Sequence, residues 1–386
     1  MIMNDRERFQ NIMEYKPIDR MPAYYFGLWR ETLARWRDEG LPSEDKDDIA
    51  NATGMDPDWE YGMWNVHEIV NIGTIAPGQA EILEETDTYS IVKLPTGAVQ
   101  KQSKIGASIP QHLAEALLPT RESWDRFKTF LDPEDPSRYP PDWETRAQAL
   151  NQRDRVTACF GGSLFGWPRE WLGIEAISYL AYDDPLLYEE IIEYLSEYFM
   201  QLLAPVMKTA KFDFAYFFED CCFKSGPLFS PDTYRKYYHK YYRKMTDFYH
   251  AMGVRHILID SDGKVDDLIP CWMDSGFDIL FPIEVGTWQA NPVLLRKQYG
   301  KALRMMGGVD KNVIPHGEKT IREHLKPLKE LASEGGFIPL PDHRIPPDCS
   351  LEAFRTYIRV FKETFQTNQL RSPRPAAVQA SGDHPA

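Results

Sequence analysis

Short apolar runs in the second half of the chain end in acidic residues or in a histidine. The polar residues at these ends are Glu219, Asp220, Asp260, Asp262, Glu284, Asp310, Lys311, Asp342 and His343. If the runs are parallel strands of one sheet, their carboxyl ends lie on one side and these side chains face one another. Several carboxylates around one cavity repel each other, so such a site favours bound protons or a bound cation.

The segment Asp260-Ser-Asp-Gly263 has two carboxylates at positions i and i+2. They point the same way if the strand continues through both residues. His343 follows the last apolar run. Two carboxylates and an imidazole are hard ligands that suit zinc or another divalent ion with one position open for substrate. We therefore predict that Asp260, Asp262 and His343 bind a metal ion.

The same residues also have a purely structural interpretation. An acidic residue at a strand end can cap the helix that follows, because the amino end of a helix favours negative charge. The ring of His343 could simply bond Asp342 or a backbone carbonyl. For one residue alone the two interpretations are about equally good, whereas so many acidic strand ends together favour a site.

The apolar runs predict the fold that positions these residues. Each is short, suits a buried strand and is followed by a helical pattern, which is typical of a parallel sheet. Two further strands from the early part of the chain would complete a (β/α)₈ barrel, and no Gly-x-Gly-x-x-Gly follows any strand to favour a Rossmann fold. The six runs are residues 155–162, 213–220, 255–263, 278–284, 303–310 and 336–343.

The first hundred residues differ from this repeated pattern. Residues 6–15 and 27–39 have helical periodicity and surround a β-rich run at 20–26, which predicts an N-terminal helical extension and an early strand. Alternating residues between 66 and 105 predict an inserted β-meander. We expect a single α/β domain over residues 1–365, and a disordered tail over residues 366–386.

Composition excludes several classes of partner. The chain has 386 residues, and 44 Lys and Arg against 58 Asp and Glu give a net charge of −14. Nucleic acid and anionic membranes are poor partners for such a protein. We find neither a long apolar segment nor a signal-peptide pattern, so we expect a cytoplasmic protein, with a homodimer as one option. The five cysteines are scattered and indicate no disulfide framework.

Several segments resemble the uroporphyrinogen decarboxylase superfamily, which also contains corrinoid-dependent methyltransferases. They are residues 6–22, Asp260-Ser-Asp-Gly263, the run Met306-Gly-Gly-Val-Asp-Lys311 and residues 334–348. The resemblance covers residues 1 to about 365 and implies a (β/α)₈ barrel.

The resemblance favours the methyltransferase branch. Porphyrinogen decarboxylases have an Arg-Gln-Ala-Gly-Arg type segment, whereas residues 26–31 here contain one arginine, too few to hold an octa-acid. Methyltransferases acting on coenzyme M hold zinc with His-x-Cys-Gly and a later Cys. These positions correspond to Asp260, Asp262 and His343 here, so oxygen and nitrogen replace thiolate and we do not expect a thiol acceptor.

The activity implied is an O-demethylase type of methyl transfer. A methyl group would pass from a methoxylated donor, aromatic by preference, to the cobalt(I) corrinoid of a partner protein. The corrinoid would come from the partner because this chain lacks an Asp-x-His-x-x-Gly loop. Zinc on Asp260, Asp262 and His343 would stabilise the leaving oxygen, with Glu219 and Glu284 as candidate fourth ligands or proton carriers.

Aromatic residues near the first strands and the following loop could wall a pocket for a flat ring, although core packing explains each of them as well. Asp310 and Lys311 are assigned to substrate binding too. Two other classes stay open, a decarboxylase of a smaller acid and a non-catalytic binding barrel. The aromatic candidates are Tyr24, Tyr25, Phe26, Trp29, Phe165, Trp167, Phe217 and Phe218.

Overall fold

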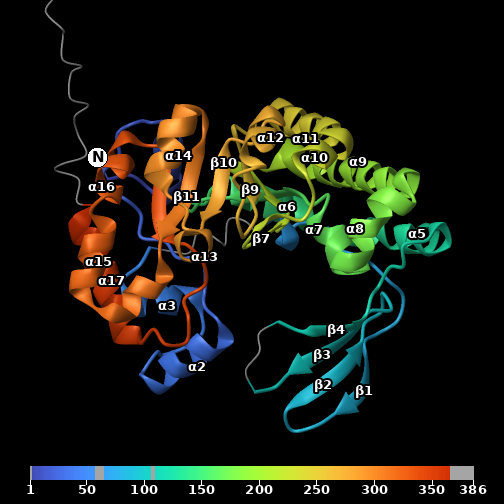
Figure 1. The fold of residues 1–386 in the computed structure, drawn as a ribbon, viewed down its shortest axis with the longest axis horizontal. Coiled ribbons are helices and arrows are strands. Elements are labelled where there is room, and N and C mark those ends of the chain that lie inside the picture. Colours follow the sequence, from blue (N-terminus) through green and yellow to red (C-terminus); the bar gives the residue numbers. More distant parts are fainter. Residues whose placement is uncertain (1, 57–64, 106–108, 366–386) are drawn as a thin grey trace, which may run out of the picture.

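The structure, a computed structural model, describes residues 2–56, 65–105 and 109–365. Its centre is an all-parallel sheet of six strands in the order β12-β11-β10-β9-β6-β5 (Figure 1). All six strands predicted in the second half of the chain are confirmed. They are β5 (Ala158–Gly162), β6 (Phe214–Phe218), β9 (His256–Asp260), β10 (Ile279–Ile283), β11 (Arg304–Val309) and β12 (Phe337–Pro341).

Helices alternate with these strands, which explains why the strands are continuous apolar runs. Every residue of β5, β9, β10 and β12 is buried, as expected for a parallel sheet covered on both faces. The helices after β5 are α7 (Gly166–Leu172), α8 (Ile174–Asp183), α9 (Pro185–Thr209), α10 (Pro231–Tyr237), α11 (His239–Ala251), α12 (Ile269–Asp274), α13 (Val285–Trp288), α14 (Pro292–Tyr299), α15 (Glu318–Leu325), α16 (Leu328–Glu334) and α17 (Leu351–Thr364).

The early strand predicted at residues 20–26 is wrong. Pro22 has no N–H, and the Ala23 N–H bonds the Asp56 carboxylate at 2.7 Å instead of a strand. Nearby, Leu28 forms only an isolated parallel bridge with Ile345. The described residues therefore establish a mixed α/β fold with a six-stranded parallel sheet, and closure into an eight-stranded barrel stays a prediction.

The predicted N-terminal helices are present. A capping box of Asn4 and Glu7 begins the first of them, and Arg6 on it forms an ion pair of 3.1 Å with Asp213 before β6. The helices before β5 are α1 (Asp5–Met13), α2 (Arg30–Asp38), α3 (Lys46–Thr53), α5 (Arg121–Lys128) and α6 (Trp143–Leu150), with short 3₁₀ turns such as η1 (Asn65–Glu68) and η5 (Lys311–His316) elsewhere.

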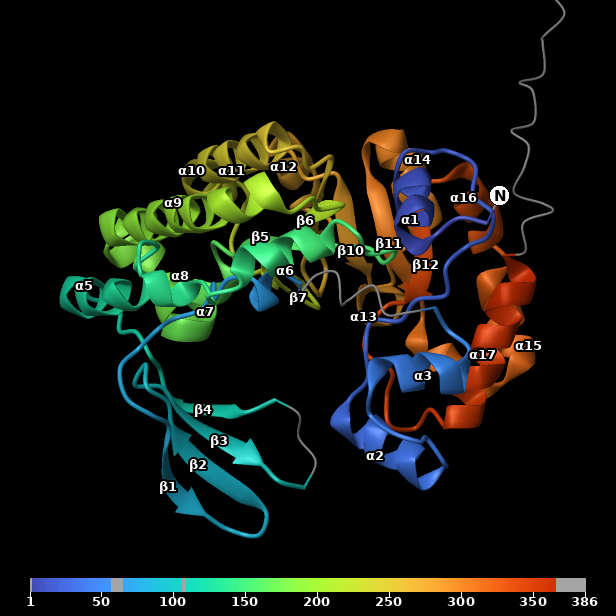
Figure 2. The same cartoon turned by 180° about the vertical axis from the view of Figure 1, so that it is seen from behind.

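An antiparallel sheet projects from the body beside α7 and α8 (Figure 2). Its strands pair in chain order, β1 (Glu81–Glu85), β2 (Tyr89–Lys93), β3 (Val99–Ser103) and β4 (Gln111–Ala114). The first three lie where the meander was predicted, and β4 lies beyond that segment. All five residues of β1 are exposed, so this sheet has little core of its own.

None of the helices in the described part of the chain combines the length and hydropathy needed to cross a membrane. The tail predicted at 366–386 lies outside the described residues.

Candidate metal centre and adjoining groove

Three of the predicted side chains converge where β9, β10 and β12 end. Asp262, Glu284 and His343 each place a ligand atom within 4.8 Å of the other two. His343 Nε2 lies 3.1 Å from Asp262 Oδ2. Strands β9 and β10 adjoin in the sheet, whereas β12 is separated from β10 by β11, so the tertiary fold alone unites these residues.

The chemistry of this cluster fits a divalent cation. Asp262 Oδ1 is buried and has no hydrogen-bond partner among the described residues. Burial, and then the charge of Asp262, raises the pKa of Glu284. An orphaned carboxylate oxygen beside a second carboxylate and an imidazole is a ligand set that a metal ion would satisfy, with room for a further ligand.

Neighbouring groups hold these ligands in place. The Gly263 N–H donates to Glu284 Oε2 at 2.7 Å, and the Thr287 hydroxyl donates to Oε1 at 2.9 Å. The His343 ring packs edge-on against Phe26, with centroids 5.0 Å apart, and lies 5.7 Å from Trp29. Two of the predicted aromatic residues, Phe26 and Trp29, therefore lie at the centre.

Asp260 does not join the cluster, contrary to the predicted trio. Strand β9 ends at Asp260, so the two-residue alternation of a strand does not extend to Asp262. The Asp260 carboxylate instead accepts a hydrogen bond from Tyr216 on the neighbouring strand β6. Glu284 takes the third place in the ligand set.

Glu219 is also not a metal ligand in this arrangement. It is 1% exposed, and its carboxylate accepts hydrogen bonds from the N–H groups of Leu164, Phe165 and Gly166 at 2.8–3.1 Å. It therefore anchors the amino end of α7 to the end of β6. Burial raises the pKa of Glu219 to about 7.

The residues after β11 and β12 have structural partners. Asp342, fully buried, accepts from the N–H groups of Val285, Gly286 and Lys311. The Lys311 ammonium lies 3.7 Å from Asp342, and Asp310 caps η5 by accepting from the Asn312 N–H. The capping interpretation therefore holds for these strand ends, and the structure does not bring Asp310 or Lys311 to a substrate surface.

The other aromatic candidates divide between core and surface. Phe165 is buried against Phe229, with centroids 4.9 Å apart, and Tyr24 is fully buried beside Asp5. Tyr25 packs on Phe354, and Phe217 packs on helix residues. These four side chains pack in the core, and none of them lines the groove described below. Trp167 and Phe218 remain, because both line a groove.

This groove runs between β4, the segment before it, and α7. Its volume is about 710 Å³, and it extends past Phe218 to Asp220 at the end of β6. The Asp220 N–H donates to the Asp260 carbonyl at 3.2 Å, so this end of the groove adjoins the end of β9, two residues before Asp262. The lining is Ile109, Pro110, His112, Glu115, Trp167, Arg169, Glu170, Gly173, Ile174, Phe218 and Asp220.

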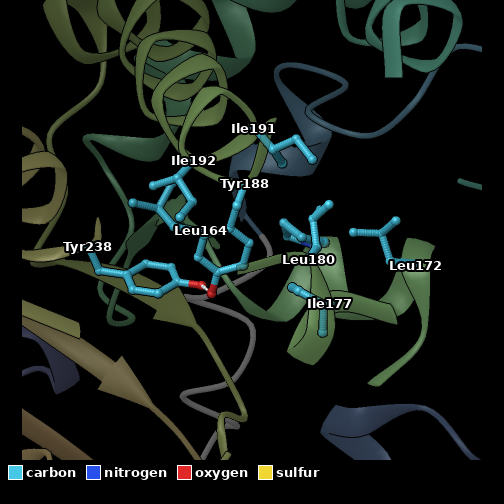
Figure 3. A pocket seen from close by; sticks show the side chains of 9 residues that line it. Leu164, Leu172, Ile177, Leu180, Tyr188, Ile191, Ile192 and Tyr238 are labelled. Carbon is cyan, nitrogen blue, oxygen red and sulfur yellow. Dashed lines mark hydrogen bonds between the residues drawn. The ribbon is translucent and has the colours of Figure 1, made fainter. Parts of the chain in front are cut away.

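A second pocket lies among α7, α8 and α9 (Figure 3). It has no room for a water molecule. The hydroxyls of Tyr188 and Tyr238 bond each other across it, and the other lining side chains are apolar. This pocket is therefore a packing gap and not a reaction site.

Sequence reasoning missed two polar residues. Tyr216, the partner of Asp260, stands inside an apolar run, where only its alternation with Phe214 and Phe218 indicated an inward face. Arg169 lies in α7, and its guanidinium bonds Asp220 and Glu170 in the groove. No spacing in the sequence links Arg169 to Asp220 at the end of β6.

Comparison with known proteins supplies the class. Residues 170–364 match the uroporphyrinogen decarboxylase (URO-D) family, and the chain belongs to this family. Among solved structures, a methyltransferase from Methanosarcina mazei is similar, with a TM-score of 0.52 and 14% identity over 94% of this chain and 99% of that one. At that identity the likeness concerns the fold.

A B12-independent methionine synthase from Shewanella sp. W3-18-1, in complex with selenomethionine, has a TM-score of 0.41 and 10% identity over 89% of this chain and 98% of that one. A search among curated proteins returned no match.

Proposed function

We propose that this protein is a corrinoid-dependent methyltransferase of the O-demethylase type. It moves a methyl group from a methoxylated donor, aromatic by preference, to the cobalt(I) corrinoid of a partner protein. The observation that carries the proposal is the cluster of Asp262, Glu284 and His343 with its orphaned carboxylate oxygen. The name of the structurally similar Methanosarcina mazei protein, a methyltransferase, agrees with it.

Zinc is the ion proposed for this cluster. Aspartate, glutamate and histidine are all zinc ligands, and three protein ligands with one open position are typical of a catalytic site. When bound there, a divalent ion would draw electron density from the ether oxygen of the donor, so that this oxygen leaves more easily.

The chain's own residues orient the donor and hold a proton. Phe26 and Trp29 pack on His343 and fix its ring, as the Gly263 and Thr287 donors fix Glu284. The Tyr216 hydroxyl donates a hydrogen bond to Asp260, two residues before Asp262, and is the proposed proton donor to the leaving oxygen. The groove beside the cluster would hold the rest of the donor.

Metal binding is the first test. We expect the purified protein to bind about one zinc ion per chain, measured by equilibrium dialysis and elemental analysis. Asp262→Asn and His343→Ala should each weaken binding by more than about 100-fold, because losing a direct ligand costs more than losing an outer partner. Asp260→Asn is the matched control and should retain the ion, with circular dichroism to confirm that each variant folds.

Methyl transfer is the second test. A methoxylated donor mixed with the protein and a reduced corrinoid protein should change the cobalt(I) spectrum to that of methyl-cobalt(III). If no donor in a broad panel does so with a corrinoid protein active toward another methyltransferase, the proposal fails. The alternative, a decarboxylase of a smaller acid, predicts release of carbon dioxide by metal-free protein instead.

A further inference from the structure

The groove beside the metal cluster is lined by more acidic than basic side chains. Glu115, Glu170 and Asp220 contribute three carboxylates, and Arg169 contributes the one guanidinium among the lining residues. These four groups therefore give the lining two more negative than positive charges. Asp262 adds a further negative charge at the Asp220 end, since the Asp220 N–H bonds the carbonyl of Asp260, two residues before Asp262.

The guanidinium of Arg169 is already engaged. Its Nη1 donates to Asp220 Oδ2 at 2.7 Å and to the Asp220 carbonyl at 2.7 Å. Its Nη2 donates to Glu170 Oε1, also at 2.7 Å. The Arg169 side chain is only 16% exposed, so it cannot swing out to meet an anion without breaking these bonds. The described lining of the groove therefore offers an incoming carboxylate no free cation.

His112 changes the negative charge of the groove lining little. Its Nδ1 lies 3.2 Å from Glu115 Oε2, so even its protonated ring already faces a carboxylate. The remaining lining suits an apolar body, since Trp167 and Phe218 present rings and Ile109 and Ile174 present aliphatic surface.

We propose that this groove selects methyl donors by charge. It admits a methoxylated ring whose remaining substituents are uncharged or cationic, and it rejects one that carries a carboxylate. A carboxylated donor would bring a like charge against a partly buried acidic lining, which costs affinity, whereas a neutral donor meets no such repulsion. This inference rests on the proposed function, because it places the donor in the groove.

Three ligands that share a 4-methoxyphenyl group test the inference. They are 4-methoxybenzoate, 4-methoxybenzyl alcohol and 4-methoxybenzylamine, which differ chiefly in the charge of one substituent. Binding to the zinc-loaded full chain would be measured by isothermal titration calorimetry. We expect the benzoate to bind at least about tenfold more weakly than the alcohol, and the ammonium compound to bind no more weakly than the alcohol.

A pair of variants links the selection to the groove. Glu170→Gln removes one negative charge beside Arg169, so it should strengthen benzoate binding and narrow the difference in affinity between the benzoate and the alcohol at least about threefold. Glu175→Gln makes the same change on an exposed part of α8 outside the lining and should leave the difference unchanged.

Each outcome decides the matter. Selection by charge would be overturned if the benzoate bound more tightly than the alcohol, or if none of the three ligands bound. It would also be overturned if the two variants had equal effects. If the benzoate binds more tightly than the alcohol and its methyl group is transferred, the selection by charge fails but the proposed function stands. Failure of methyl transfer with every donor would instead remove the proposed function, while the measured binding order would still decide the inference.

Discussion

At the scale of single residues, two carboxylates only two positions apart have different roles. Asp260 is the last residue of β9 and bonds Tyr216, whereas Asp262 lies beyond the strand and meets His343. The boundary of a strand is the feature that local sequence determines least well. The structure therefore brings Asp262 and His343 together as expected, with Glu284 and not Asp260 beside them, and metal binding by the three stays a prediction.

Asp5 is a residue whose burial has a measurable consequence. Its side chain is 11% exposed, and burial raises its pKa to about 6, although the nearby Tyr24 hydroxyl acts in the opposite direction. Between the ordinary value near 3.8 and about 6, the folded state holds a proton that the unfolded state has lost. The contribution of Asp5 to stability is therefore present at low pH and lost as pH rises through that window.

We predict that Asp5→Asn removes this loss. We take the unfolding free energy of the variant minus that of the wild type. This difference should be greater at pH 7 than at pH 4.5 by about 2 kcal/mol. Urea denaturation at the two pH values measures it. Asp87→Asn, at an exposed bend, is the control and should show no such difference. The assignment is wrong if the two variants respond alike.

At the scale of elements, the six parallel strands were predictable because burial on both faces makes them apolar throughout. The run at 20–26 is equally apolar, yet a side-chain carboxylate takes its backbone N–H. Pro22 removes one N–H from this run, and Asp56, 33 residues beyond Ala23 in the chain, takes the next.

Gly307 tests the fit between β10 and β11. Its φ is +119°, and a Cβ there would lie 2.5 Å from the backbone nitrogen of Ile283, at the point where the register of the two strands shifts. Gly307→Ala should lower the unfolding free energy by about 3 kcal/mol, because both the backbone strain and the clash are fixed by the sheet. Denaturant unfolding measures this.

Gly253 provides the matched control. Its φ is +91°, but no described atom lies within 4 Å of the position that an added methyl group would take, so Gly253→Ala tests backbone strain alone. That variant should lose only about 1 kcal/mol. If both variants lost the same unfolding free energy, the close approach of β10 and β11 would contribute nothing to the loss at Gly307.

At the scale of the whole molecule, the two sheets differ in what covers them. The parallel sheet is buried on both faces, whereas β1 is exposed along its whole length and β2 to β4 are largely half-buried or exposed. Backbone hydrogen bonds without a buried apolar face open at low free energy. The molecule therefore joins a stable body to a weaker projecting sheet.

Hydrogen exchange should reveal this difference. In native-state exchange followed by mass spectrometry, we expect amides of β1 to β4 to exchange well before those of β5, β6 and β9 to β12. The comparison is internal, since all these amides lie in strand ladders. Equal protection of both sheets would mean that another surface, such as a second copy or a partner, covers the antiparallel sheet in solution.

The sequence by itself determined the six buried strands, the N-terminal helices, and the acidic character of the strand ends. These features depend on local composition and periodicity, which the chain carries wherever it folds. The tertiary structure alone decided which strand ends meet, because Asp262, Glu284 and His343 are united by strand order and by the residue at which β9 ends. It also decided the partner of Arg169 at one end of the groove, since Asp220 lies at the end of β6, 51 residues further along the chain, and only packing brings it within hydrogen-bond distance.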